Sequence, residues 1–295
     1  MSWRGVARWV GFSAGAVALL GTTFTLGVLA GAGSTPAPPP PAPPGLLDDA
    51  AGHIVGNALR PVDREALDSA AMKAMLGAAG DRWGHWGAPS PSPNGTAVST
   101  VMVTPQVGRI VVPTFTRGTG RQVRQAVATL HDRRATGIVL DLRHNAGGLL
   151  SESVETTSVF LSGGHVVTYN RRDERPQRLD AVGHGDTTTP LVVLVDGGTA
   201  SGAEVVAGAL QDRGRAVIVG SRTFGKGSVQ EPHRLSDGSS LALTVARYSL
   251  PSGRSIEGVG IEPDIDVVLP GAMVGRALEV LIGLRADSSA DSSAR

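Results

Sequence analysis

The distribution of apolar and polar residues along the chain predicts alternating strands and helices. Short, nearly continuous apolar runs predict buried strands at residues 137–142, 191–195 and 216–219. Apolar residues at helical spacing predict helices at 120–134 and 202–210. The remaining predicted elements are strands at 109–113, 165–170 and 241–250 and helices at 149–161 and 272–284. This alternation implies parallel βαβ units with right-handed crossovers, and therefore an α/β fold.

The most informative stretch covers residues 191–230. It begins with the apolar strand, which Asp196-Gly197-Gly198 interrupts. Ser201 then stands at the start of the alanine-rich helix. After the next strand, residues 220–227 form a loop with three glycines and one lysine, Lys226. The order of elements is therefore strand, serine, helix, strand, lysine.

A serine at a strand-to-helix turn is suited to nucleophilic catalysis. Its hydroxyl lies near the helix N-terminus, where unpaired N–H groups and the helix dipole favour negative charge. The tetrahedral intermediate of acyl transfer carries such a charge. Lys226 could supply the base if burial lowers its pKa enough to leave the amine neutral. From the residues alone, an N-cap serine beside a surface lysine remains an open interpretation.

The spacing of Ser201, Lys226 and Gln230 is a further indication of catalytic chemistry. Lys226 follows Ser201 by 25 residues, and Gln230 follows Lys226 by four. With the surrounding words DGGTASGAE, AGALQD and TFGKGSVQ, this pattern resembles the catalytic core of the C-terminal processing, or tail-specific, serine peptidases. The resemblance implies a Ser201/Lys226 dyad assisted by Gln230, with an acyl-enzyme intermediate. At Gly202 and Ala203 the family often has a second small residue or serine, but only the backbone matters to the chemistry there.

A second matching word, LRHNAGG at residues 142–148, is similar to the family's L-R-x-N-x-G-G. Glycine lets a backbone N–H approach a ligand without a Cβ in the way. The resemblance implies that an N–H of Gly147 or Gly148, together with that of Gly202, forms an oxyanion hole. An ordinary strand-to-helix turn is the alternative. The word GVGIEPD at 258–264 resembles the family's closing G-x-G-I-x-P-D turn.

The resemblance covers residues 109–267 well and 46–86 loosely. It implies a ClpP/crotonase-like α/β spiral for the peptidase core at 108–285, preceded by a small helical region at 46–87. Residues 88–107 are a short, turn-rich linker where most family members insert a PDZ domain, and 286–295 are small and polar, as in a disordered tail. A PDZ domain binds C-termini by strand addition, so we expect weak selectivity for substrate C-termini.

The N-terminus predicts export. Residues 9–32 form an uncharged run of 24 residues, preceded by Arg4 and Arg8. Residues 1–33 are therefore either a transmembrane anchor with a cytoplasmic N-terminus or a signal peptide cut after Ala30-Gly31-Ala32. The proline-rich linker at 34–45 favours polyproline II and acts as a semi-rigid spacer. We expect an extracytoplasmic protein, either anchored to the cell membrane or secreted.

Composition narrows the function classes. The chain has 295 residues, 41% of them hydrophobic, and a formal charge of +1, which argues against nucleic-acid binding. It contains no cysteine, which excludes disulfides, thiolate zinc sites, a cysteine nucleophile and a lipoprotein cysteine. The seven histidines form no metal-binding motif. The dyad requires no cofactor, the expected partners are polypeptide substrates, and the oligomeric state is left open.

Three other functions compete with a serine endopeptidase. Residues 220–226 match the phosphate-binding pattern G-x-x-x-x-G-K, but Gly227 replaces the hydroxyl residue and no helical period follows. A Ser-His-Asp hydrolase could pair Ser201 with His144 or His233, although the G-x-S-x-G pattern is absent. A non-catalytic peptide-binding or scaffold protein could share the fold.

Overall fold

The computed structural model describes residues 45–88 and 97–293. The chain divides into two compact units, residues 1–67 and 68–295. The predicted anchor or signal peptide at 1–33 and nearly all of the proline-rich linker lie outside the described residues. Within the described ranges, no helix has both the length and the apolar character needed to cross a bilayer.

The described part of the first unit is helical. It contains α2 (Leu46–Asn57) and the first residues of α3 (Arg64–Ala78). Arg64 forms an ion pair with Asp48 of α2. The region predicted to be helical up to residue 87 ends differently, because β1 (His85–Gly87) follows α3 and pairs with β10 (Ser240–Ser249) in the second unit.

A six-stranded sheet forms the centre of the second unit. Its strands follow the order β11-β8-β7-β4-β3-β2, and all neighbours are parallel except the β2–β3 pair. The strands are β2 (Ser99–Thr104), β3 (Val107–Val111), β4 (Gly137–Asp141), β7 (Leu191–Val195), β8 (Val217–Gly220) and β11 (Ile265–Asp266). The predicted α/β arrangement of parallel strands is therefore confirmed.

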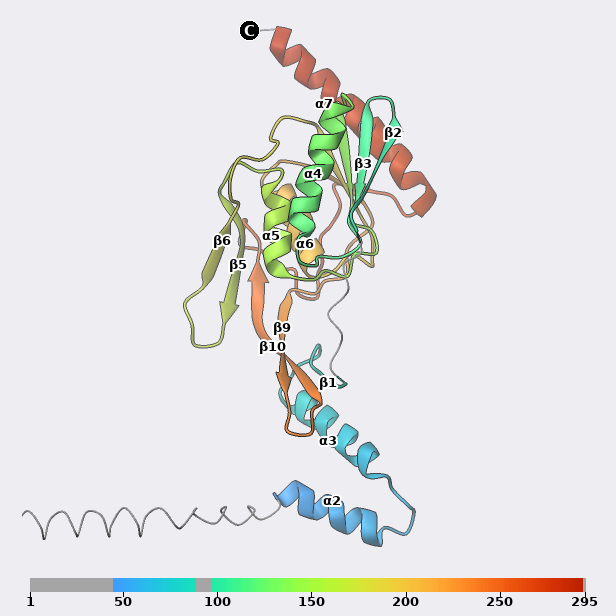
Figure 1. Ribbon diagram of the computed structural model, residues 1–295, viewed down its shortest axis with the longest axis vertical. Helices are drawn as coiled ribbons and strands as arrows, with labels where there is room; N and C mark the ends of the chain where they lie inside the picture. Colours follow the sequence, from blue (N-terminus) through green and yellow to red (C-terminus); the bar gives the residue numbers. More distant parts are fainter. Residues whose placement is uncertain (1–44, 89–96, 294–295) are drawn as a thin grey trace, which may run out of the picture. The chain divides into compact units, whose positions relative to one another are not determined.

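Helices cover both faces of this sheet, which explains why its strands are continuous apolar runs (Figure 1). In β4, Ile138 and Leu140 belong to the core cluster that also contains residues of α4, α5 and α6. Val139 points to the opposite cluster, which contains residues of α7. The covering helices are α4 (Thr119–Asp132), α5 (Leu150–Ser158), α6 (Gly202–Asp212) and α7 (Met273–Ser293).

A second, antiparallel sheet carries Gln230. Its path is β1-β10-β5-β6, and β9 also pairs with β10. The additional strands are β5 (His165–Arg171), β6 (Gln177–Asp180) and β9 (Ser228–Arg234). Because β10 pairs with both β1 and β9, this sheet connects the segment after α3 to the strand that carries Gln230.

Besides β1, the elements that differ from the sequence prediction include β2, β6 and the end of α7. Residues 99–104 lie within the predicted linker but form β2, which pairs antiparallel with β3. The prolines that precede this strand in the sequence led to the prediction of a linker. Residues 177–180 belong to no element predicted from the sequence but form β6, an edge strand whose charged residues obscure the alternating pattern of a strand. The C-terminal helix continues to Ser293 through the predicted disordered tail, because each residue added to a formed helix gains a hydrogen bond.

We predict that Gly220→Ala lowers the free energy of unfolding by about 3 kcal/mol or more. Gly220 ends β8 with φ +139°, and a Cβ there would collide with the carbonyl oxygen of Val195. Gly214→Ala is the matched control, because Gly214 also has positive φ (+60°) but faces open space. The control should lose about 1 kcal/mol. Chemical denaturation measures both, and equal losses would contradict the packing argument.

Candidate active site

The predicted site residues lie at the carboxyl ends of three neighbouring parallel strands. The strand order places β4, β7 and β8 side by side. The loop after β4 carries Gly147 and Gly148, the loop after β7 carries Ser201, and the loop after β8 carries Lys226. The carboxyl edge of a parallel sheet is where loops from adjacent strands converge and ligands commonly bind. Parallel pairing therefore gathers segments that are far apart in the sequence.

Ser201 has an unusual backbone conformation at the start of α6. It is the N-cap residue, with φ 55° and ψ −118°. Positive φ is uncommon for a residue with a side chain, and such strain is concentrated at functional sites. A hydrogen bond to the loop after β4 holds this turn in place: Ala200 N–H donates to the carbonyl oxygen of Asn145 at 2.9 Å. The strained turn therefore holds a half-buried serine at the helix N-terminus.

The glycine turn after β4 lies directly against Ser201. A Cβ added to Gly147 would lie 2.9 Å from Cβ of Ser201 and 3.0 Å from the backbone nitrogen of Gly202. Gly147 N–H already donates to Asn145 Oδ1 at 2.8 Å. Within the described part of the chain, the N–H groups of Gly148 and Gly202 donate to no acceptor. Of the glycines predicted for the oxyanion hole, Gly148 and Gly202 therefore have N–H groups free for a ligand.

The carboxylate of Glu204, which is fully buried, joins the serine turn to the lysine loop. Its Oε2 accepts hydrogen bonds from the backbone N–H groups of Ser201 and Lys226, both at 2.8 Å. Its Oε1 accepts from Gly225 N–H at 2.8 Å and from Thr223 Oγ1 at 2.5 Å. Four donors satisfy the buried charge, as a carboxylate in a protein interior requires. Glu204 thereby fixes the main chain of Ser201 relative to that of Lys226.

The side chain of Lys226 is half-buried in the loop after β8. Burial lowers the pKa of its amine, and the nearby carboxylate of Glu257 opposes that shift. The Nζ atom lies 5.6 Å from the centre of the Trp83 ring. Among the described residues, no hydrogen bond joins Lys226 Nζ to Ser201. The structure thus brings the lysine loop to the serine, with the amine resting on an aromatic ring.

Two further side chains from the second sheet reach this region. Gln230 on β9 donates its amide hydrogens to Ser228 Oγ at 3.2 Å and to Thr244 Oγ1 at 3.3 Å. The hydroxyl of Tyr248 on β10 faces the Ser201 side chain. Burial raises the pKa of Tyr248 to about 12, and the interaction with Ser201 opposes the rise. Tyr248 is therefore a neutral phenol near neutral pH and not a base.

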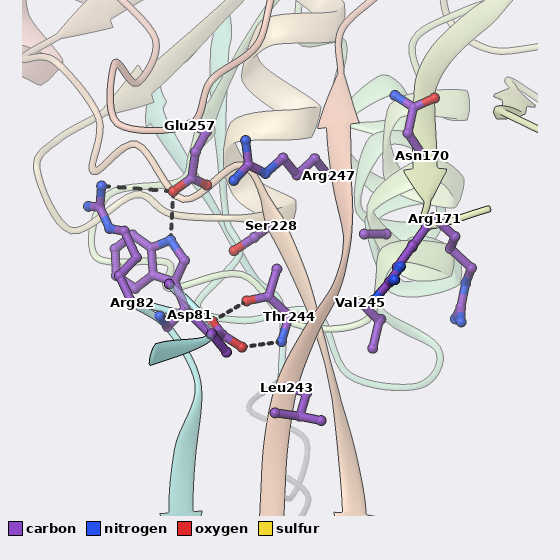
Figure 2. A pocket seen from close by; sticks show the side chains of 15 residues that line it. Asp81, Arg82, Asn170, Arg171, Ser228, Leu243, Thr244, Val245, Arg247 and Glu257 are labelled. Atoms are coloured by element: carbon purple, nitrogen blue, oxygen red, sulfur yellow. Dashed lines mark hydrogen bonds and ion pairs between the residues drawn. The ribbon is translucent and has the colours of Figure 1, made fainter. Parts of the chain in front are cut away.

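A cavity of about 660 Å³ adjoins the lysine loop. Figure 2 shows its lining, with Asp81, Arg82 and Glu257 on one side and Asn170 and Arg171 on the other. Its walls come from the segment after α3, the end of β5 and the middle of β10. The cavity provides space for part of a ligand beside the candidate site.

His144 and His233, which the sequence offered as alternative catalytic bases, do not have the contacts that such a base requires. His144 Nδ1 pairs with Asp196 Oδ2 at 2.9 Å, and its side chain is 85% exposed. His233 lies on β9 and is exposed. Neither ring forms a hydrogen bond with Ser201 in the described ranges. Asp196 also accepts from the N–H groups of His144 and Gly198, both at 2.9 Å, so it organises the loop after β7.

A protein-family model matches the part of the chain that contains this candidate site. The model of Peptidase family S41 matches residues 106–267, more than half of the chain. The chain belongs to peptidase family S41. The match includes the glycine turn, Ser201, Lys226 and Gln230, and it ends at the strand β11 that completes the large sheet.

Curated relatives carry the same core in longer chains. A carboxy-terminal-processing protease of Bartonella bacilliformis is 42% identical over 60% of this chain and 42% of the relative. A carboxyl-terminal-processing protease of Synechocystis is also 42% identical, over 56% of this chain and 38% of the relative. The chain therefore spans about two fifths of the length of the curated relatives it matches.

Solved structures share the fold. A photosystem II D1 C-terminal processing protease is 36% identical, with a TM-score of 0.54 over 59% of this chain and 48% of the other. A lipoprotein from Streptococcus agalactiae has a TM-score of 0.52 at 19% identity, over 65% and 71% of the two chains. The second likeness concerns the fold alone.

Several residues that surround this S41 site were not predicted from the sequence. Glu204 could have been found, because Ser201-Gly202-Ala203-Glu204 has the S-x-x-E pattern of a helix capping box. Tyr248, Trp83 and Glu257 had no comparable signal. Their contacts with the site arise from pairing in the second sheet and from the segment after α3, which local patterns do not reveal.

We predict that Glu204→Gln lowers the free energy of unfolding by about 3 kcal/mol. The amide replaces one acceptor oxygen with an NH₂ group facing N–H donors, so buried donors lose their partner. Glu279→Gln on α7 is the control, because that carboxylate is 65% exposed and pairs with Arg276 at the surface. It should change stability by less than about 0.5 kcal/mol. Chemical denaturation of both variants checks this. A Glu204→Gln protein as stable as the control would contradict the role of Glu204 in holding the serine turn to the lysine loop.

Proposed function

We propose that this S41 chain is a serine endopeptidase in which Ser201 and Lys226 form the catalytic dyad. The observation that carries the proposal is the fully buried carboxylate of Glu204, which accepts hydrogen bonds from the backbone N–H groups of both residues. A strained nucleophile turn and two unpaired glycine N–H groups support the same function. The curated relatives are named as carboxyl-terminal-processing proteases, which agrees with peptide hydrolysis.

The proposed reaction begins with attack of Ser201 Oγ on the carbonyl carbon of a peptide bond. Neutral Lys226 takes the serine proton, and the N–H groups of Gly148 and Gly202 bind the oxyanion. The lysine ammonium then protonates the leaving amine, leaving an acyl-enzyme that water hydrolyses. Substrate binding brings the amine and hydroxyl into contact, since catalytic hydrogen bonds are often long without substrate.

Gln230 supports the lysine in this scheme. Both of its amide hydrogens have partners, on Ser228 and Thr244. Its oxygen is thus the end left to accept a hydrogen bond from the lysine amine. An amide oxygen orients the amine without a negative charge that would hold the proton on it.

Particular contacts weigh against the competing functions. In a phosphate-binding loop, backbone N–H groups bind the phosphate. Here the N–H groups of Gly225 and Lys226 already bind Glu204. A histidine base is disfavoured by the exposed position of His144. A non-catalytic scaffold on this fold would bind peptides without turnover, so peptide hydrolysis by this chain is the observation that would exclude it.

The proposed substrates are extracytoplasmic polypeptides. The uncharged run at 9–32 and the proline-rich segment after it support a location outside the cytoplasm, either tethered or secreted. The core at 108–285 is proposed to be the ClpP/crotonase-like spiral, with the helical region at 46–87 before it. Cell fractionation tests the location, and recovery of the protein in the cytoplasm would refute it.

We predict that Ser201→Ala reduces hydrolysis of unfolded proteins and tagged peptides by at least about 10³-fold. The fold should be retained, because the hydroxyl is removed while the backbone N–H to Glu204 remains. Peptide cleavage measured by mass spectrometry, beside an unfolding curve, checks both statements. Cleavage near the wild-type rate would remove Ser201 from the mechanism.

We predict that Lys226→Arg is as inactive as Lys226→Ala. Arginine stays protonated at any relevant pH and cannot accept the serine proton. His144→Ala is the matched control, because it removes the competing base, and this variant should retain activity. Rates of peptide hydrolysis compare the three variants. An active Lys226→Arg enzyme combined with an inactive His144→Ala enzyme would favour the histidine mechanism.

We predict that Gln230→Glu moves the onset of activity to higher pH. A carboxylate beside the amine favours the ammonium form and raises the pKa of Lys226, so a more alkaline solution is needed to obtain the neutral base. Gln230→Ala, which adds no charge, is the comparison. The pH dependence of kcat/KM is the measurement. An unchanged profile for Gln230→Glu, with Gln230→Ala harmless, would show that Gln230 does not contact the base.

We predict that amidating the C-terminus of a cleaved peptide changes its rate of hydrolysis by less than about threefold, too little for a lost buried charge contact. Residues 88–98, 11 in all, separate β1 from β2, far fewer than a domain needs. This connection is therefore too short to hold a domain that would bind a free carboxylate. A large loss of rate would mean that another part of the chain recognises the carboxylate.

A further inference from the structure

The turn that follows α3 reaches the lysine loop through one aromatic side chain. The ring of Trp83 packs against Phe224 with 5.4 Å between ring centres. On the same ring, Lys226 Nζ lies 5.6 Å from the centre, within the range of a cation–π contact. The indole Nε1 donates a hydrogen bond to Glu257 Oε1 at 2.8 Å. Trp83 therefore touches Lys226 with its face and holds Glu257 with its edge.

Glu257 is held from three sides beside the lysine. Besides the indole, Gly227 N–H donates to its Oε2 at 2.9 Å, and Arg82 Nη1 lies 3.9 Å from Oε1. The side chain is only 16% exposed, so solvent screens its charge weakly. Figure 2 shows Arg82 directed toward this carboxylate at the edge of the cavity. Glu257 is thus a carboxylate held against the lysine loop, and it opposes the lowering of the Lys226 pKa.

The turn is also anchored to the strand beside Gln230. Asp81 accepts hydrogen bonds from Thr244 N–H and Thr244 Oγ1, both at 2.7 Å (Figure 2). The same Thr244 hydroxyl accepts from Gln230 Nε2. Burial raises the pKa of Asp81, but its hydrogen bonds to Thr244, Gly84 and Trp83 outweigh that and lower it overall. Asp81 stays ionised and keeps Trp83 in place.

Other charged or titratable groups surround the lysine loop without duplicating this effect. Glu204 binds the backbone N–H of Lys226, and its charge is satisfied by four donors. Tyr248 faces Ser201 as a neutral phenol. Arg82 partly offsets the charge of Glu257, and its guanidinium lies 4.4 Å from the centre of the Trp83 ring. Arg247 is a second cation that lines the same cavity as Glu257. The carboxylate whose charge acts on the lysine amine is Glu257.

We propose that Trp83 and Glu257 are positioning residues for Lys226, which together set the pH at which the amine becomes a base. Trp83 provides the surface on which the amine rests and orients the carboxylate, and Glu257 favours the protonated amine. The inference rests on the proposed function, because it concerns the base of that reaction. It assigns the segment before β1 a part in the chemistry of the core.

The alternative is that Trp83 and Glu257 only anchor the turn to the core. A purely structural role would change stability or the maximal rate, but not the pH at which activity begins. The test is therefore the pH dependence of Ser201 reactivity in the full chain. Labelling of Ser201 by a fluorophosphonate probe gives a rate without knowledge of the natural substrate, and peptide hydrolysis gives a second one.

Glu257→Gln should move the acid limb of both profiles to lower pH. Without the carboxylate charge the ammonium form of Lys226 is less favoured, so the pKa of the amine falls. On that limb the variant should react about threefold or more faster than the wild type. Glu262→Gln is the matched control, since Glu262 is an exposed carboxylate paired with Arg222. Its profile should coincide with that of the wild type.

Trp83→Phe keeps an aromatic face but removes the N–H that holds Glu257. It should move the acid limb in the same direction, and it should add little in the Glu257→Gln background, because both changes act through one carboxylate. Trp86→Phe is the control, because Trp86 Nε1 donates to Ser239 Oγ at 2.8 Å, away from Lys226. Thermal unfolding of every variant separates loss of fold from a change in the base.

Three outcomes decide the matter. A downward shift in Glu257→Gln and Trp83→Phe that is not additive, with both controls unshifted, supports the inference. Unshifted profiles in folded variants whose Ser201 is still labelled overturn it and leave the proposed function intact. Absence of Ser201 labelling and hydrolysis in the wild type overturns the proposed function, and the inference with it.

Discussion

The buried carboxylate of Glu204 is the interaction on which the candidate site depends. A charge in the interior is tolerated only when hydrogen-bond donors surround it, and here four donors do so. Two of them are the main-chain N–H groups of Ser201 and Lys226, which lie on loops that follow different strands. Satisfying one buried charge therefore fixes the serine turn against the lysine loop. The strain at Ser201 persists because this network over-determines its backbone.

The parallel sheet supplies the second constraint. Adjacent parallel strands end at the same edge, so the loops after β4, β7 and β8 meet although long helices separate them in sequence. The core on both faces leaves little freedom for the strands to shift, since Ile138 and Leu140 pack on one side and Val139 on the other. The glycine turn can approach Ser201 closely only because Gly147 has no Cβ.

The antiparallel sheet connects this rigid edge to the rest of the second unit. β10 pairs with β1, β5 and β9, so one strand contacts the turn after α3, the cavity wall and the strand carrying Gln230. The hydrogen bonds that Thr244 donates to Asp81 and that Trp83 donates to Glu257 follow from that pairing. The lysine amine is thereby surrounded by groups from several distant segments. Such an arrangement allows its protonation to be adjusted without altering the nucleophile turn.

The sequence alone determined the features that local patterns encode. Short apolar runs mark β4 and β7 because strands buried on both faces need apolar residues at every position. Ser201, Lys226 and Gln230 lie within one continuous stretch, so their residue types and spacing were visible as a motif. By contrast, β2 and β6 were missed, because their pairing partners and not their own composition make them strands. Only the tertiary structure decided that Gly147 uses its N–H on Asn145, leaving Gly148 free. It also decided that Trp83 meets Glu257 across 174 positions of sequence. Contacts of that range depend on how sheets pair and loops converge, and no local pattern of residues carries that information.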